Sequence, residues 1–241
     1  LSGNDTRGID VGVMSRVPVE VGSNASLTYD FIADVALDWP QLEALGASRD
    51  RKIFRRDCSI VEVETGGAPL TIFNCHFKSM QILSPGGDPR LDTRLLRLAE
   101  AHAVRRLVER RVGGEGAKRA NWAICGDLND YVAIEGAPAA GSALGPLLDD
   151  GFAVDPMTRL PPEERWTYFF PLEDIYVQLD HLLLSPRLAE ANPHTLPRLI
   201  RQGQPWRVPR LENEPRYPRV GWARPKASDH CPIVIELNLP G

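Results

Sequence analysis

The sequence predicts a mixed α/β domain, and three features of the chain indicate this class. The first is a pair of strand-like segments joined by a glycine- and proline-containing turn, which is typical of an antiparallel hairpin. The second is a set of short apolar runs bounded by polar residues, as buried strands are. The third is one long segment with helical periodicity. The length of 241 residues suits one large α/β domain or two small ones.

Six segments are predicted to be strands by their apolar patterns. They are residues 7–15, 58–65, 70–75, 122–125, 181–185 and 231–239. The second and third form an antiparallel hairpin, because Gly66, Gly67 and Pro69 lie between them. The fourth and fifth are continuously apolar, so we expect them to be buried in the interior of a sheet.

One helix is predicted from Leu91 to Val112, a range that contains neither glycine nor proline. Apolar side chains recur there at four-residue steps from Leu95 to Leu107, which places them on one face of a helix. Gly113-Gly114 ends the helix. No Lys-Ser/Thr pair follows these glycines, so a surface turn is favoured over a phosphate-binding loop.

Composition excludes several classes of protein. The net charge is −4, so the chain is not a strongly basic body held to nucleic acid by charge alone. No apolar run approaches the ~20 residues that a membrane span needs. The cysteines have no C-x-x-C spacing and lie in or beside apolar runs, which predicts buried free thiols. They are Cys58, Cys75, Cys125 and Cys231.

The segment 193–226 differs from the rest of the chain because it is rich in proline and arginine. It holds eight Arg or Lys residues against Glu212 and Glu214. Trp206, Tyr217 and Trp222 favour an ordered loop, since aromatic rings need a surface to pack on. Several arginines of this loop could then lie near the entrance of a functional site. The alternative is that their positive charge only neutralises the acidic remainder of the chain. The arginines concerned are Arg207, Arg210, Arg216, Arg219 and Arg224.

Polar side chains gather where predicted strands end. Asn74, His76 and Lys78 alternate along an extended chain, so they face the same way. Asp127 and Asn129 share this spacing after a buried strand. Each motif alone also fits an ordinary polar strand face or an Asx turn.

Two Asp-His pairs, 180–181 and 229–230, stand at the start of two further apolar strands. With the first two clusters they supply carboxylates for a hard cation, imidazoles for proton transfer or phosphate contact, and amides to orient oxygen. The sequence has no G-x-S-x-G, H-E-x-x-H or Walker motif. It therefore predicts attack by water, assisted by a divalent metal and without a covalent enzyme intermediate.

Five motifs, in this order, resemble those of the endonuclease/exonuclease/phosphatase superfamily, which includes pancreatic deoxyribonuclease. They are Arg-Gly-Ile-Asp (7–10), Asn-Cys-His-Phe-Lys-Ser (74–79), Gly-Asp-Leu-Asn-Asp (126–130), Leu-Asp-His (179–181) and Ser-Asp-His (228–230). With Trp-Thr-Tyr (166–168), the chain is most similar to bacterial nuclease-like members. The resemblance implies one domain over residues 1–241. Its fold would be a four-layer α-β-β-α sandwich of two mixed, mostly antiparallel sheets with helices on both outer faces.

The resemblance also implies catalytic roles for strand-end residues. Asp127 would orient or deprotonate the attacking water, and Asn129 would hold a phosphate oxygen or help to position that water. His230 would hydrogen-bond the scissile phosphate, while Asp180 orients its imidazole. His76 would contact the phosphate and stabilise the leaving oxygen.

Metal and substrate contacts are implied at further positions. Asp229, together with Asp127, would bind Mg²⁺, for which Mn²⁺ is the expected substitute. Asn74, Lys78 and Tyr168 would contact the substrate.

One part of the family pattern is missing. In the family, a strand carrying an Asn and a second strand ending in a metal-ligand Glu precede the segment that matches residues 7–10. Neither Asn4 nor Asp5 stands in the context of that Glu. Leu1 is therefore expected to be a cut within a longer chain, or the protein a shortened relative. The fold would lack its N-terminal strands, and the metal site would be weakened.

The leading functional prediction is a Mg²⁺-dependent phosphohydrolase, most simply a phosphodiesterase or nuclease acting on nucleic acid. A phosphomonoesterase or a lipid head-group hydrolase of the phosphoinositide or sphingomyelin type is the alternative within the same chemistry. A non-catalytic binding module with a degenerate metal site is the alternative from a different class. Neither localisation nor oligomeric state follows from the sequence.

Overall fold

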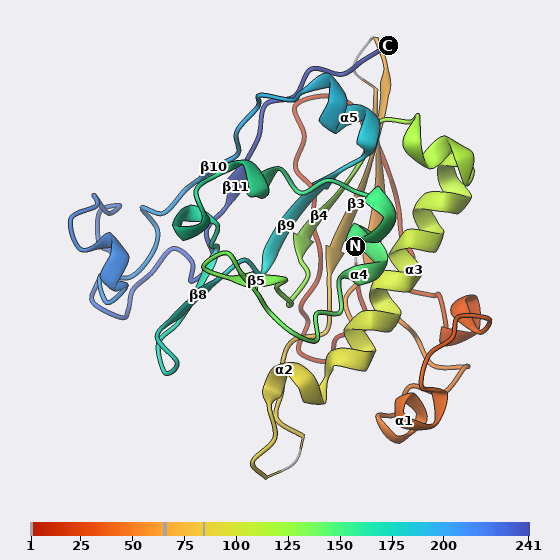
Figure 1. Cartoon of the computed structure of the whole chain (residues 1–241), viewed down its shortest axis with the longest axis horizontal. Coiled ribbons are helices and arrows are strands. Elements are labelled where there is room, and N and C mark those ends of the chain that lie inside the picture. Colours follow the sequence, from red (N-terminus) through yellow and green to blue (C-terminus); the bar gives the residue numbers. More distant parts are fainter. Residues whose placement is uncertain (1, 65–66, 84) are drawn as a thin grey trace.

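The computed structural model describes residues 2–64, 67–83 and 85–241, and its centre is a five-stranded sheet (Figure 1). The strand order in this sheet is β1-β2-β3-β4-β9. The strands are β1 (Val19–Gly22), β2 (Cys58–Glu64), β3 (Pro69–His76), β4 (Trp122–Asp127) and β9 (Asp180–Leu184). All neighbours pair antiparallel except β3 and β4, which run parallel.

Two smaller sheets complete the strands of the described chain. A four-stranded sheet has the order β6-β5-β8-β7, and β10 pairs with β11. Their bounds are β5 (Ala133–Ile134), β6 (Ala137–Pro138), β7 (Tyr168–Phe170), β8 (Ile175–Val177), β10 (Arg198–Leu199) and β11 (Ile233–Val234). The expected class is confirmed: a mixed α/β fold whose main sheets are mostly antiparallel.

The helices are short apart from α3. They are α1 (Trp39–Ala44), α2 (Pro89–Asp92), α3 (Arg94–Val112), α4 (Gly145–Leu148) and α5 (Pro186–Ala191). Short 3₁₀ turns lie at Tyr29–Ile32, Glu115–Lys118, Asp149–Gly151, Pro156–Arg159, Pro162–Glu164 and Pro209–Leu211. None of the helices in the described ranges has the length and apolar character that crossing a membrane requires.

Apolar side chains are buried on both faces of the central sheet. On one face, Ala99 and Ala103 of α3 pack with Phe73 and Ile124 of the sheet, and small alanine side chains let the helix approach closely. Figure 1 shows α3 running along this face. On the other face, a second cluster joins the sheet to α5 and to the C-terminal segment, through Leu237 among others. The site edge is thus held by packing from both sides.

Local sequence patterns predicted these central elements correctly. The hairpin is β2–β3, the two buried runs are β4 and β9, and the helix covers the expected range with a break at Thr93 between α2 and α3. Gly113 ends α3 with a φ of 77°, a left-handed conformation that glycine adopts without strain. Thr65 and Gly66, the end of the second predicted strand and the start of its turn, lie outside the described residues. All four cysteines are free thiols, as expected.

Two strand predictions are wrong. Residues 7–15 form no strand, and Met14 there is fully exposed. Within residues 231–239 only Ile233–Val234 is a strand, and it pairs with two residues of β10. A strand forms only where another segment pairs with its backbone, and within the described chain neither range finds a longer partner. The second layer of the fold is consequently built from short strands.

Candidate active site

The register of the central sheet brings three of the predicted site residues into one row. His76 ends β3 and is paired with Asp127 at the end of β4. Asp127 is in turn paired with Asp180, the first residue of β9. Adjacent strands lie about 4.8 Å apart, so these side chains emerge side by side at one edge of the sheet.

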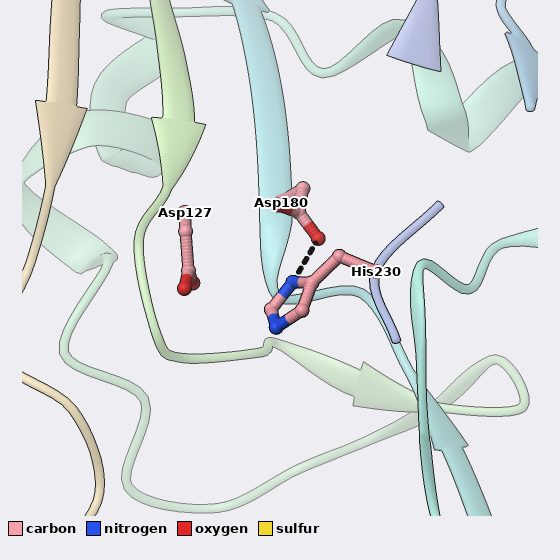
Figure 2. A group of neighbouring side chains, drawn as sticks. All are labelled: Asp127, Asp180 and His230. Atoms are coloured by element: carbon pink, nitrogen blue, oxygen red, sulfur yellow. Dashed lines mark hydrogen bonds and ion pairs between the residues drawn. The ribbon is translucent and has the colours of Figure 1, made fainter. Parts of the chain in front are cut away.

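His230 reaches this row from the segment before β11, which is 50 residues away from Asp180 along the chain. Its Nδ1 lies 2.8 Å from Oδ2 of Asp180, as Figure 2 shows. One ligand atom each of Asp127, Asp180 and His230 lies within 4.8 Å of the others. The carboxylate of Asp180 fixes the proton of the imidazole on Nδ1 and leaves Nε2 for another partner.

Tyr168 packs against His230. The two rings have centroids 4.8 Å apart, and the backbones of these residues form an isolated β-bridge. The predicted substrate residue Tyr168 therefore lies at the cluster. In the structure, the ring of Tyr168 contacts the imidazole of His230.

Burial and charge shift the protonation of the cluster. Burial, followed by the nearby carboxylate of Asp180, raises the pKa of Asp127 to about 6. Burial alone would lower the pKa of His230, but the hydrogen bond and charge of Asp180 outweigh it and raise that pKa. Two close carboxylates repel each other, and a cation between them would relieve this repulsion.

His76 and Asn129 flank Asp127. Nε2 of His76 is 3.5 Å from Oδ2 of Asp127. Burial and the charge of Arg56 lower the pKa of His76 to about 4, so this imidazole is neutral at pH 7. The backbone N–H of Asn129 donates to Oδ1 of Asp127 (2.9 Å), while its side-chain amide donates to the carbonyl of Phe77 (3.1 Å). The amide nitrogen of Asn129 therefore supports the loop.

The remaining predicted residues make their polar contacts away from the three-residue cluster. The Asn74 amide donates to the carbonyl of Gly12 (3.1 Å), and Nζ of Lys78 donates to Ser79 and Gln81. The carboxylate of Asp229 forms an ion pair of 2.7 Å with Lys226. Asp229 stands next to His230 in sequence, yet the group of described residues whose geometry could hold a metal ion contains Asp180 and not Asp229.

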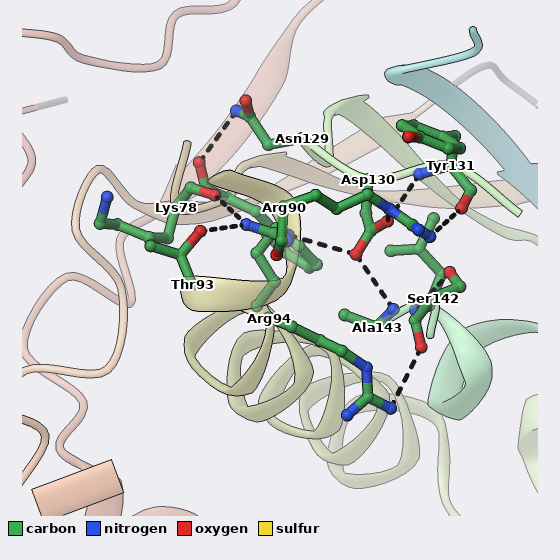
Figure 3. A network of polar contacts seen from close by, with 12 residues as sticks. Lys78, Arg90, Thr93, Arg94, Asn129, Asp130, Tyr131, Ser142 and Ala143 are labelled. Atoms are coloured by element: carbon green, nitrogen blue, oxygen red, sulfur yellow. Dashed lines mark hydrogen bonds and ion pairs between the residues drawn. The ribbon is translucent and has the colours of Figure 1, made fainter. Parts of the chain in front are cut away.

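A buried ionic network supports the loop that follows β4, and it centres on Asp130 (Figure 3). Its two oxygens accept from Nε of Arg90 (2.7 Å) and Nε of Arg97 (3.2 Å). They also accept from the backbone amides of Tyr131 and Ala143. Asp130 and Arg97 are fully buried. This network fixes the chain three residues beyond Asp127.

Sequence reasoning assigned no role to this network or to Glu100, another fully buried charge on α3. Oε2 of Glu100 accepts from the backbone N–H of Lys78 (2.7 Å) and ties α3 to the end of β3. A signal was present in the sequence, since Arg97 and Glu100 lie three residues apart on the otherwise apolar face of the predicted helix. His181 shows the reverse case: it is buried and bonded to Gln178 and Asp130, so its strand-end position serves structure.

The donor set of the cluster fits a hard divalent cation. Carboxylate oxygens are the preferred ligands of Mg²⁺, and an imidazole nitrogen is tolerated by Mn²⁺. The cluster lies at a partly exposed sheet edge, where a substrate can reach it. Asp5 forms ion pairs with Arg7 and Arg56, so its carboxylate is engaged outside this cluster.

Solved structures provide the comparison. An AP endonuclease from Archaeoglobus fulgidus matches at 17% identity and a TM-score of 0.48, covering 80% of this chain and 67% of that chain. A 3′ phosphatase, NExo, from Neisseria, bound to a product DNA hairpin, matches at 17% identity and a TM-score of 0.44 (92% and 80%). An endonuclease/exonuclease/phosphatase family protein from Bacteroides thetaiotaomicron matches at 14% identity and a TM-score of 0.46 (79% and 59%).

One of these solved structures, to which the chain is similar, is described as an endonuclease/exonuclease/phosphatase family protein. No family model and no curated protein matches the chain. Since the identities to these solved structures are below 20% and the TM-scores are below 0.5, the chemistry of this chain is inferred from its own side chains.

Proposed function

We propose that the protein is a divalent-metal-dependent phosphoester hydrolase, and specifically a phosphodiesterase acting on nucleic acid. The observation that carries the proposal is the convergence of Asp127, Asp180 and His230, with the imidazole oriented by Asp180 at 2.8 Å. Two carboxylates and an oriented imidazole at an open sheet edge are the groups that water attack on a phosphoryl centre requires.

The side chains divide the reaction among them. Asp127 receives a proton from the attacking water as the new P–O bond forms. His230, held through Nδ1 by Asp180, donates from Nε2 to a phosphate oxygen, and its raised pKa favours the protonated form that donates. As the P–O bond to the leaving group breaks, neutral His76 donates a hydrogen bond to the leaving oxygen, which takes its proton from water. Asp127 and Asp180 would hold the cation, which when bound neutralises charge on the phosphoryl group and activates water.

Nucleic acid is proposed as the substrate because a basic, aromatic loop borders the site. The loop ends at Lys226, whose Nζ lies 2.7 Å from Oδ2 of Asp229, the residue before His230. Burial and then the charge of Asp229 raise the pKa of Tyr168, and the charge of Arg207 lowers it. Arg207 and Trp222 are exposed and joined by a backbone hydrogen bond of 2.9 Å. Exposed cations and aromatic rings bind phosphates and bases of single strands.

The loop uses its other arginines differently. Arg210 stacks on Tyr176 and pairs with Glu135, and Arg216 stacks on Trp206. Two of the five arginines that the sequence suggested for a site mouth are therefore engaged within the protein. The other three arginines of that set, Arg207, Arg219 and Arg224, are exposed.

The experiment compares the hydrolysis of a diester, bis(p-nitrophenyl) phosphate, with that of the mono-ester p-nitrophenyl phosphate. Each is assayed with Mg²⁺ or Mn²⁺ and with EDTA. We expect metal-dependent hydrolysis of bis(p-nitrophenyl) phosphate and its loss in Asp127→Ala. Glu43→Gln, which removes an exposed carboxylate on α1, is the matched control and should retain full activity.

Cleavage of the mono-ester alone would replace the phosphodiesterase assignment by a phosphomonoesterase. No hydrolysis of either ester, with no heat of metal binding by calorimetry, would refute the proposal and favour the binding module.

A further inference from the structure

A positively charged groove lies beside the active-site edge. It is a hollow of about 490 Å³ between the N-terminal segment, the start of β2 and the segment after β3. Its charged lining consists of four cations, namely Arg7, Arg55, Arg56 and Lys78, against the single carboxylate of Asp5. None of these cations is a member of the cluster of Asp127, Asp180 and His230.

The groove is joined to the active site through one backbone carbonyl. Nη1 of Arg56 donates to the carbonyl of Phe77 (2.7 Å), and the same carbonyl accepts from the Asn129 amide (3.1 Å). Lys78 follows His76 by two residues. Figure 3 shows its amino group directed away from the Asp130 network. The groove is therefore a lateral extension of the site along the sheet edge.

The positive charge of the groove is only partly neutralised. Asp5 is shared between Arg7, which donates to it from Nε and Nη2, and Arg56 at 3.0 Å. Among the described residues, the oxygens that accept from Nζ of Lys78 belong to Ser79 and Gln81 and are neutral. Burial, and then the charge of Arg56, lower the pKa of Lys78, so this ammonium experiences a positive field. Within the described ranges, Arg55 is exposed and no ion pair reaches it.

The distance between the groove and Asp127 determines which kind of ligand can contact both. Arg56 precedes β2, and β2 and β4 are two strand spacings apart, about 10 Å. Nucleotides in a stacked strand rise about 3.4 Å each, so two to three nucleotides cover this distance. An ester with one phosphate cannot contact Asp127 and the groove together.

We infer that this groove is a second phosphate subsite, which binds a phosphate two to three nucleotides from the scissile one in a nucleic acid strand. The inference rests on the proposed function, because it extends the same site. It adds that the substrate is a chain carrying several phosphates.

The test removes two exposed cations of the groove. Arg7→Gln/Arg55→Gln is compared with Arg51→Gln/Arg119→Gln, which removes the same charge from exposed positions outside the groove. The first readout is the ratio of kcat/KM for a (dT)6 oligonucleotide to kcat/KM for bis(p-nitrophenyl) phosphate. We expect the groove variant to lower this ratio at least tenfold and the control to change it less than twofold, since charge-assisted contacts to phosphate are the strong ones.

A second readout needs no catalysis: the affinity for fluorescent (dT)6 in EDTA, measured by polarisation over a range of salt. The groove variant should weaken binding and reduce the salt slope by about 1.4, at about 0.7 for each of two contacts to a single strand. If this holds while neither ester is hydrolysed, the subsite stands and the proposed hydrolase activity fails.

Two results would overturn the subsite. One is an unchanged ratio and salt slope in the groove variant. The other is competition by inorganic tripolyphosphate at the affinity of (dT)6, because the groove would then recognise clustered phosphate instead of a nucleic acid strand.

Discussion

Glu100 gives a test of the structure that does not depend on activity. Its side chain is 1% exposed, and Oε2 accepts the backbone N–H of Lys78, which fixes the chain two residues beyond His76. Oε1 has no hydrogen-bond partner among the described residues. The perturbation is Glu100→Gln, which keeps an acceptor for Lys78 and removes the ability to ionise.

The magnitude follows from the protonation of the carboxyl. Burial raises the pKa of Glu100 from 4.5 to about 7. The folded protein therefore holds the proton more tightly than the unfolded chain does. Stability from this group is fully present below pH 4.5 and is lost as the pH rises through about 7. At 1.36 kcal/mol per pKa unit, the free energy of unfolding should fall by about 3 kcal/mol across this range.

The assay is urea denaturation of both proteins at intervals from pH 4.5 to 8. The difference between variant and wild type isolates Glu100, because other groups such as Asp127 titrate in both. We expect near-equal stability at pH 4.5 and a variant that is more stable by about 3 kcal/mol at pH 8. A difference that is constant with pH would refute the buried, unpaired placement of this carboxyl.

Three further predictions concern the site and its support. Asp180→Asn should lower kcat by about 100-fold or more, the range of a general acid–base contribution, while the thermal midpoint barely moves; a variant with normal kcat would show that the orientation of the imidazole is not used. Asp130→Ala should cost about 3–5 kcal/mol in urea denaturation, because it leaves two buried arginines without their partner; a loss below 1 kcal/mol would contradict the network. Arg207→Gln/Arg224→Gln should reduce the salt slope of oligonucleotide binding by about 1.4, and an unchanged slope would assign these arginines to other surfaces.

Local sequence determined the central elements. The alternation in β2, the continuously apolar runs of β4 and β9, and the four-residue period of α3 each reflect which face of a segment is buried, and this is written in neighbouring residues. Asp127, Asp180 and His230 could be named as site candidates for the same reason, since Asp127 follows an apolar run and Asp180 and His230 each precede one.

Tertiary structure decided the features that depend on distant segments. Residues 7–15 and 231–239 have strand-like patterns, but pairing needs a partner whose position no local pattern states. The pairing of Asp180 with His230 joins residues that are 50 positions apart. The register of β4 and β9 makes Asp180, and not Asp229, the neighbour of Asp127. Residue types along the chain specify which groups can do chemistry. Only the register of three strands and the return of a distant loop decide which of them meet.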